Sequence, residues 1–97
     1  MKGYWLVLAS EVTDPEARAE YSKRWAPLAE KYQARINKND VPPLLKEGRN
    51  TARVLVIEFP SLEMAKACYD DPDYQEALKY AQQSATRDLL ILEGDIA

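Results

Sequence analysis

The stretch from Arg53 to Ser61 constrains the fold more than any other part of this chain. Five of its first seven residues are apolar, and four of those five are β-branched or aromatic, which is typical of a buried strand. The run ends at Pro60, which cannot donate to a sheet ladder, and Ser61 is suited to cap a helix. The sequence therefore predicts a buried strand over residues 51–59 that leads directly into a helix.

Apolar spacing and helix-start signals place the other elements. Four strands are predicted, over residues 3–11, 33–39, 51–59 and 86–93. Three helices are predicted between them, beginning after Thr13 or Asp14, after Ser61 and after Asp71. Pro27 lies inside the first helix and should bend or break it near Lys23–Arg24, because it removes a helix hydrogen bond. Residues 40–50 are expected to be a loop.

The order of these elements is β-α-β-β-α(α)-β, which predicts one ferredoxin-like α+β domain over residues 1–97. Such a βαββαβ domain has a four-stranded antiparallel sheet with helices on one face. The other face normally meets solvent, but here the first, third and last strands are apolar on both faces. No residues are left over to cover that second face, so we expect a homodimer that packs sheet on sheet.

Charge and composition narrow the classes of partner. The net charge of −3 argues against a surface that tracks nucleic-acid phosphates or an anionic membrane. RNA-recognition domains share this element order but place aromatic residues in their central strands, where this chain has Val54, Leu55, Val56 and Ile57. We therefore expect no nucleic-acid partner and no membrane partner.

The single cysteine and the N-terminal residues bear on the compartment. Cys68 is alone, so no intrachain disulfide can form, and its place on the apolar side of a helix favours an inert buried thiol over a nucleophile. The N-terminal apolar run, Tyr4–Ala9, is too short for a signal-peptide core or a membrane span. We expect a cytoplasmic protein.

The chain contains no histidine. The usual haem axial ligand, the commonest zinc ligand and the usual general base near neutral pH are therefore missing, and a Ser-His-Asp arrangement is impossible. Asp70, Asp71 and Asp73 cluster in the sequence, but acidic residues around Pro72 are more typical of a helix start than of a metal site. We expect no cofactor and no metal.

Glu58 is the first candidate for a functional residue, because a carboxylate in an apolar strand must be solvated, paired or hydrogen-bonded. As a desolvated catalytic base it could abstract a proton from a phenol or an α-keto carbon. The alternative is that it pairs with Arg35 or Arg53 and fixes the sheet.

Other residues suggest a pocket for a small molecule. Arg35 and Asn37 share one face of the second strand, and Arg53 begins the third. Together they could seat an anionic ligand, since guanidinium groups match carboxylates at two points, or they could be charges at the sheet edge. Aromatic residues at helical spacing and further along the chain could line the pocket or fill the core: Tyr21, Trp25, Tyr32, Tyr69 and Tyr74.

Several segments in matching order carry a family resemblance across nearly the whole chain: Lys2–Trp5, Tyr21, Ala34-Arg35, Val56–Ser61, Ala67 with Tyr69, Asp71–Gln75 and Glu93-Gly94. Together they resemble the family called domain of unknown function 1330. The resemblance implies a fold of the dimeric α+β barrel superfamily, in which two sheets close around each other and each protomer can hold a pocket between its sheet and its helices. Members of that superfamily include cofactor-free monooxygenases, small-molecule isomerases and proteins with no known activity.

Two functional hypotheses follow. The first is a cofactor-free enzyme, or a ligand-binding relative of one, that acts on a small aromatic or carboxylate-bearing metabolite, with Glu58 as base or polariser and Arg35 or Arg53 as anchor. The second is a non-catalytic binding or interaction module with a structural dimer. The first hypothesis requires a closed cavity beside Glu58, and the second does not.

Overall fold

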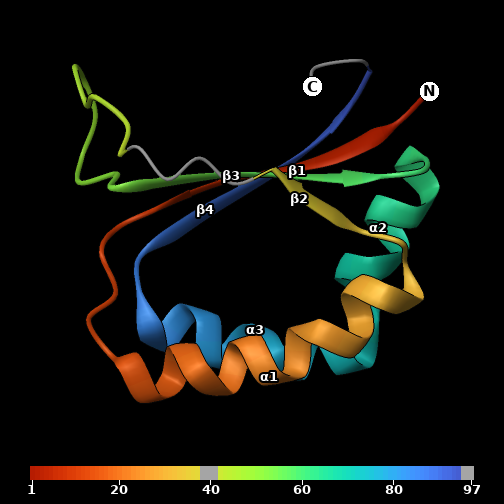
Figure 1. Ribbon diagram of the computed structural model, residues 1–97, viewed down its shortest axis with the longest axis horizontal. Coiled ribbons are helices and arrows are strands. Elements are labelled where there is room, and N and C mark those ends of the chain that lie inside the picture. The colour runs from red at the N-terminus through yellow and green to blue at the C-terminus, as the bar shows by residue number, and fades with distance from the viewer. Residues whose placement is uncertain (38–41, 95–97) are drawn as a thin grey trace.

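The computed structural model describes residues 1–37 and 42–94, and in them four strands and three helices follow the predicted order. The strands are β1 (Gly3–Ala9), β2 (Arg35–Asn37), β3 (Arg53–Phe59) and β4 (Arg87–Glu93). The helices are α1 (Pro15–Lys31), α2 (Leu62–Asp70) and α3 (Pro72–Ser84). The strands form one antiparallel sheet in the order β2-β3-β1-β4, with the helices on one side of it (Figure 1). This is the predicted ferredoxin-like α+β fold.

The helices begin at the residues that the sequence predicts. The side chains of Asp14, Ser61 and Asp71 accept hydrogen bonds of 3.1, 3.2 and 2.8 Å from backbone N–H groups two or three residues further on. Each bond satisfies a donor that a helix start leaves without a partner in the helix. These caps set where α1, α2 and α3 start.

The second strand starts later than predicted. Residues 33–39 were expected to be extended, but β2 begins at Arg35, and residues 38 and 39 lie outside the described part of the chain. Gln33 has a φ of 55°, in the left-handed region, and its N–H and that of the next residue bond back to carbonyls of α1 at 3.2 and 2.8 Å. This geometry closes the last turn of a helix, so Gln33 belongs to the end of α1.

Helix α1 continues through Pro27 to Lys31, so of the two effects predicted for Pro27 the break near Lys23–Arg24 does not occur, and the bend stays a prediction. Proline removes only one backbone donor, and Pro27 is exposed, so water can reach the carbonyl that loses its partner. The bounds of the other strands differ from the predicted ones by one or two residues. Of the predicted loop, residues 42–50 contain no helix or strand, and residues 40 and 41 lie outside the described part.

The core lies between the sheet and the helices and is built around Trp5 of β1. The ring of Trp5 lies 4.9 to 5.9 Å from those of Trp25, Phe59, Tyr69 and Tyr74. Its indole N–H donates to the carbonyl oxygen of Ala65 in α2 at 2.9 Å, so the polar edge of this buried ring is satisfied. This cluster joins all three helices to the sheet.

The other face of the sheet is also apolar, as the sequence predicts. Its central residues, read from the strand register, are Leu6, Leu8, Val54, Val56, Leu90 and Leu92. Within one chain most of them are only partly buried, and Leu90 is 45% exposed. Monomeric proteins rarely expose a contiguous apolar patch of this kind. We call these six residues the open face. Among the described segments, no helix lies on this side of the sheet (Figure 1).

Candidate functional site

A cavity of about 220 Å³ lies between the helix-facing side of the sheet and helices α1 and α3. The sheet contributes apolar side chains to its lining, among them Val7, Leu55 and Ile57. Helix α1 contributes two aromatic side chains, Tyr21 and Trp25. The cavity therefore has an apolar floor and aromatic walls, which is typical of a small-molecule site.

Three arginines line the same cavity: Arg18 of α1, Arg53 at the start of β3 and Arg87 at the start of β4. In the strand register Arg53 and Arg87 flank Ala9 of β1 from opposite sides. Ala9, which has a small side chain, lines the cavity between them. Arg87 also borders a wider depression of about 640 Å³ that is open to solvent.

The positive charge of this cavity has no described counterion. Among the described residues no carboxylate lines the cavity, and the ion pairs that are formed involve none of the three arginines. Burial, together with the charges of Arg18 and Arg87, lowers the pKa of Arg53. The Nε of Arg53 donates to the carbonyl oxygen of Ser10 at 3.0 Å, which holds the side chain and leaves its terminal nitrogens for a ligand. This setting favours an anion.

Two tyrosines lie beside Arg87. The guanidinium carbon of Arg87 is 5.1 Å from the centre of the Tyr21 ring, and the hydroxyl oxygens of Tyr21 and Tyr74 are 3.2 Å apart. Burial alone would lower the pKa of Arg87, but the two neighbouring tyrosines outweigh it and raise that pKa. Burial raises the pKa of Tyr74, which is fully buried, so its hydroxyl keeps its proton.

Of the predicted ligand-binding residues, Tyr21, Trp25 and Arg53 come together at this cavity. Tyr69 does not line it: its ring packs against Trp5 at 5.9 Å, in another part of the core.

Glu58 and Arg35 lie on the opposite face of the sheet from Arg53. They are register partners in β3 and β2 and line a shallow, open depression at the edge of the sheet. Glu58 pairs with Lys2 at 3.3 Å, in place of the predicted pairing with Arg35 or Arg53. Asn37 lies further along β2, opposite a residue of the open face. The predicted set of ligand residues is therefore divided between two faces of the sheet.

Arg18 and Arg87 are not among the ligand-binding residues predicted from the sequence. A signal for each was present: Arg18 precedes Tyr21 and Trp25 by three and seven residues, a spacing that puts all three on one side of a helix. Arg87 alternates with Leu89 and the apolar residue two further on, a spacing that puts them on one face of a strand.

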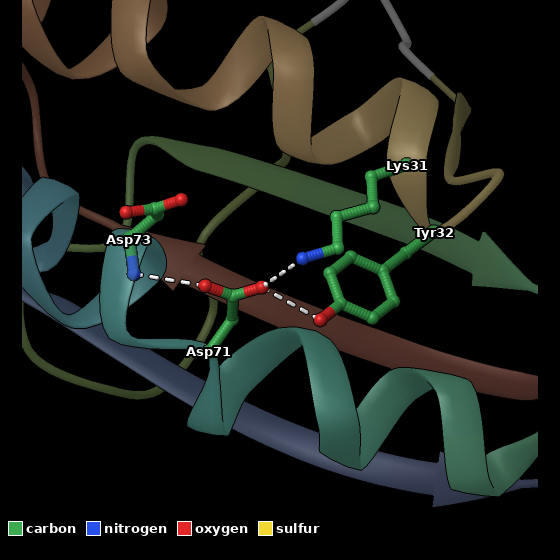
Figure 2. A network of polar contacts seen from close by, with 4 residues as sticks. All are labelled: Lys31, Tyr32, Asp71 and Asp73. Carbon is green, nitrogen blue, oxygen red and sulfur yellow. Dashed lines mark hydrogen bonds and ion pairs between the residues drawn. The ribbon is translucent and has the colours of Figure 1, made fainter.

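The acidic cluster around Pro72 has a structural role. Asp71 caps α3, and its second carboxylate oxygen accepts hydrogen bonds from Lys31 Nζ at 2.9 Å and from the Tyr32 hydroxyl at 2.7 Å (Figure 2). The bonds from Tyr32 and then Lys31 lower the pKa of Asp71 to about 2. The network ties the end of α1 to the start of α3. No group of three metal-ligating side chains is placed to hold a metal ion in the described part of the chain.

Cys68 is fully buried in α2, as predicted, and burial raises the pKa of its thiol to about 12. The thiol therefore stays protonated near neutral pH, which is the state of low reactivity. Separately, none of the described helices has the length and apolar character needed to cross a membrane.

The fold and the cavity define a small ferredoxin-like α+β protein with an arginine-lined hollow between its sheet and its helices. The chain belongs to the family described as domain of unknown function (DUF1330), whose model matches residues 2–95. No curated protein is a significant match to the sequence.

Solved structures share the fold at low identity. A protein of unknown function from Rhodopseudomonas palustris is similar with a TM-score of 0.71 and 23% identity, over 96% of this chain and 82% of that one. A dimeric ferredoxin-like protein of unknown function from Jannaschia sp. CCS1 gives a TM-score of 0.66 at 17% identity, over 97% and 100%. SnoaB, a cofactor-independent oxygenase from Streptomyces nogalater, gives 0.58 at 13% identity, over 99% and 95%.

Proposed function

We propose that this protein binds a small carboxylate-bearing metabolite with an aromatic or apolar body in the cavity between the sheet and helices α1 and α3. The observation that carries the proposal is the cluster of Arg18, Arg53 and Arg87 around a cavity whose described lining contains no carboxylate. Like charges gathered in a partly buried site are unfavourable, and an anion that accepts hydrogen bonds from two guanidinium groups relieves them. Carboxylates fit the guanidinium fork well.

The volume and the walls of the cavity indicate the size and character of the part of the ligand that carries the carboxylate. A volume of about 220 Å³ is below the ~300 Å³ at which pockets for drug-sized molecules begin, so it suits a metabolite with one ring or a short chain. Tyr21 and Trp25 offer aromatic surface for such a body, and the side chains of the sheet offer an apolar floor.

A cofactor-free enzyme acting on the same class of metabolite is the second candidate. It is supported by the shared fold of SnoaB, described as a cofactor-independent oxygenase, at 13% identity. Glu58, the predicted base, lies on the opposite face of the sheet and does not line the cavity. The geometry therefore favours binding over proton abstraction by Glu58, and a catalytic role for this residue stays a prediction.

We also propose a homodimer in which the open faces of two protomers pack against each other. The face is apolar across three strands, and two sheets packed about 10 Å apart would bury it. Three structures with the same fold, from Bacteroides fragilis, Thermobifida fusca and Jannaschia, are described as dimeric.

The substitution Glu58→Gln distinguishes the cavity from the depression beside Arg35. The ion pair of Glu58 with Lys2 is partly exposed, with side-chain exposures of 15% and 47%, so its loss should change the free energy of unfolding by less than about 1 kcal/mol. Ligand affinity should also stay within twofold, measured by calorimetric titration. A loss of affinity of tenfold or more would show that Glu58 belongs to the ligand site.

The substitution Arg53→Gln tests the binding site directly, with phenylacetate and the uncharged phenylacetamide as probes. Wild-type protein should bind the acid more tightly than the amide. Arg53→Gln should weaken the binding of the acid by about tenfold or more, because hydrogen bonds to a charged group contribute roughly 1.5–3 kcal/mol. Titration calorimetry measures both affinities.

The matched control for this test is Arg24→Gln. Arg24 lies on α1, pairs with Glu20 at 2.7 Å on the exposed side and does not line the cavity. Its removal changes the net charge by the same amount and should leave the affinity as it was. Equal affinity of the wild-type protein for the acid and the amide, or equal losses in the two variants, would contradict the proposal.

A further inference from the structure

We infer that Tyr21 supplies the cavity with a hydrogen-bond donor for a second oxygen of the ligand, so that the site prefers a 2-oxo acid to a plain carboxylate. The inference rests on the proposed function, because the carboxylate of the ligand is taken to be held by the arginines. It adds a residue that determines which carboxylate binds.

The direction of the hydrogen bond between Tyr21 and Tyr74 follows from where their protons can go. The two hydroxyl oxygens are 3.2 Å apart, and by distance alone either could donate. Tyr74 is fully buried and does not line the cavity. Among the described residues the Tyr21 oxygen is the acceptor within reach of its hydroxyl, because Arg87, the other polar group beside Tyr74, can only donate. If Tyr21 donated instead, the proton of Tyr74 would be buried without an acceptor, which is unfavourable. Tyr74 is therefore the donor.

Tyr21 then has its own proton left to donate. Its oxygen accepts from Tyr74, and Tyr21 lines the cavity, where a ligand can reach it. Arg87 lies beside its ring and cannot take the proton, because a guanidinium group only donates. This side of the cavity therefore presents two donors, Tyr21 and Arg87, and an oxygen that only accepts fits both.

The strand register is compatible with a second oxygen on the Arg87 side of the cavity. Arg53 and Arg87 flank Ala9 from opposite sides, so with a carboxylate held at Arg53 the donors Arg87 and Tyr21 lie on the other side of Ala9. A carbonyl oxygen on the carbon next to the carboxylate has two lone pairs and no proton of its own. That arrangement is a 2-oxo acid, and the aromatic walls suit one with a ring.

Benzoylformate and phenylacetate are matched probes, because they differ by a carbonyl group in place of a methylene group and carry the same charge. Wild-type protein should bind benzoylformate about five- to tenfold more tightly, as one or two additional hydrogen bonds predict. Tyr21→Phe should lower the ratio of the two affinities by about threefold or more, because Arg87 is then the donor that remains for the second oxygen. Tyr80→Phe is the control, since it removes the same hydroxyl from a partly exposed tyrosine of α3 outside the cavity, and it should keep the ratio.

The outcomes of these titrations separate a failure of the inference about Tyr21 from a failure of the proposed function. Equal affinities of the wild-type protein for both acids would overturn the inference about Tyr21 and leave the proposed function standing, as would a ratio that survives Tyr21→Phe. If wild-type protein binds neither acid, the proposed function fails and the inference fails with it. The wild-type ratio is measured without any substitution, so the inference can be tested even if Tyr21→Phe does not fold.

Discussion

Leu90→Glu is expected to convert the protein from a dimer to a monomer at micromolar concentration. Leu90 lies on the open face and is 45% exposed within one chain, so a glutamate there costs the folded protomer little. In a dimer that packs sheet on sheet, the same carboxylate would be buried without a partner. That burial costs several kcal/mol, so the dimer dissociation constant should rise by about a thousandfold or more.

Light scattering during size-exclusion chromatography measures this change. Ala19→Glu is the control, because Ala19 is exposed on α1, on the side of the sheet away from the open face, and the substitution adds the same charge. This variant should remain a dimer. A wild-type monomer at micromolar concentration, or a Leu90→Glu variant that stays dimeric, would refute packing through the open face.

Asp71→Asn is expected to lower the melting temperature at pH 7 by roughly 5–10 °C. The side chain of Asp71 is only 6% exposed, and its carboxylate holds Lys31 and Tyr32 at 2.9 and 2.7 Å (Figure 2). Asparagine keeps an oxygen that can cap α3 but removes the charge that strengthens both bonds. Thermal denaturation followed by circular dichroism measures the change. Asp73→Asn is the control, because Asp73 takes part through its backbone N–H, which the substitution leaves in place.

The effect of Asp71 on stability should depend on pH in a defined direction. The pKa of Asp71 is lowered from 3.8 to about 2, chiefly by the hydrogen bond from Tyr32. A carboxyl group whose pKa is depressed in the folded state stabilises that state fully above its unfolded pKa, and this contribution is lost as the pH falls through the folded pKa. The difference in melting temperature between wild type and Asp71→Asn should therefore be constant above about pH 5 and shrink between pH 4 and 2. A difference that does not change down to pH 2 would contradict the role of the charge.

Local signals were enough to predict the order of the elements. Asp14, Ser61 and Asp71 can be assigned as helix caps because each is a short polar residue directly before a run with helical apolar spacing. Such a side chain accepts a hydrogen bond from a backbone N–H group in the first turn of the helix. The β-branched run of β3 and the apolar residues on both faces of β1 predicted these two strands. The end of α1 was missed because the left-handed turn at Gln33 has no signal in its residue type, since neither glycine nor asparagine occurs there.

The candidate site was predicted only in part, because the strands are apolar on both faces. Alternation alone then cannot tell which face the helices cover, and Glu58, Arg35 and Arg53 were grouped into one site. Arg53 and Glu58 are five positions apart, an odd number, so they must lie on opposite faces of a regular strand. Arg87 and Arg53 lie near each other because β1 pairs with both β3 and β4. That pairing is set by the tertiary fold, so the local sequence does not predict it.

A crystal structure of the protein with phenylacetate tests the central claim most directly. The proposal predicts the ligand in the cavity between the sheet and helices α1 and α3, with a carboxylate oxygen about 2.7–2.9 Å from a guanidinium nitrogen of Arg53 or Arg87. Its ring should lie against Tyr21 or Trp25. A ligand bound only at the depression beside Glu58, or a cavity that stays without ligand at saturating phenylacetate, would contradict the claim that the arginine cluster is the binding site.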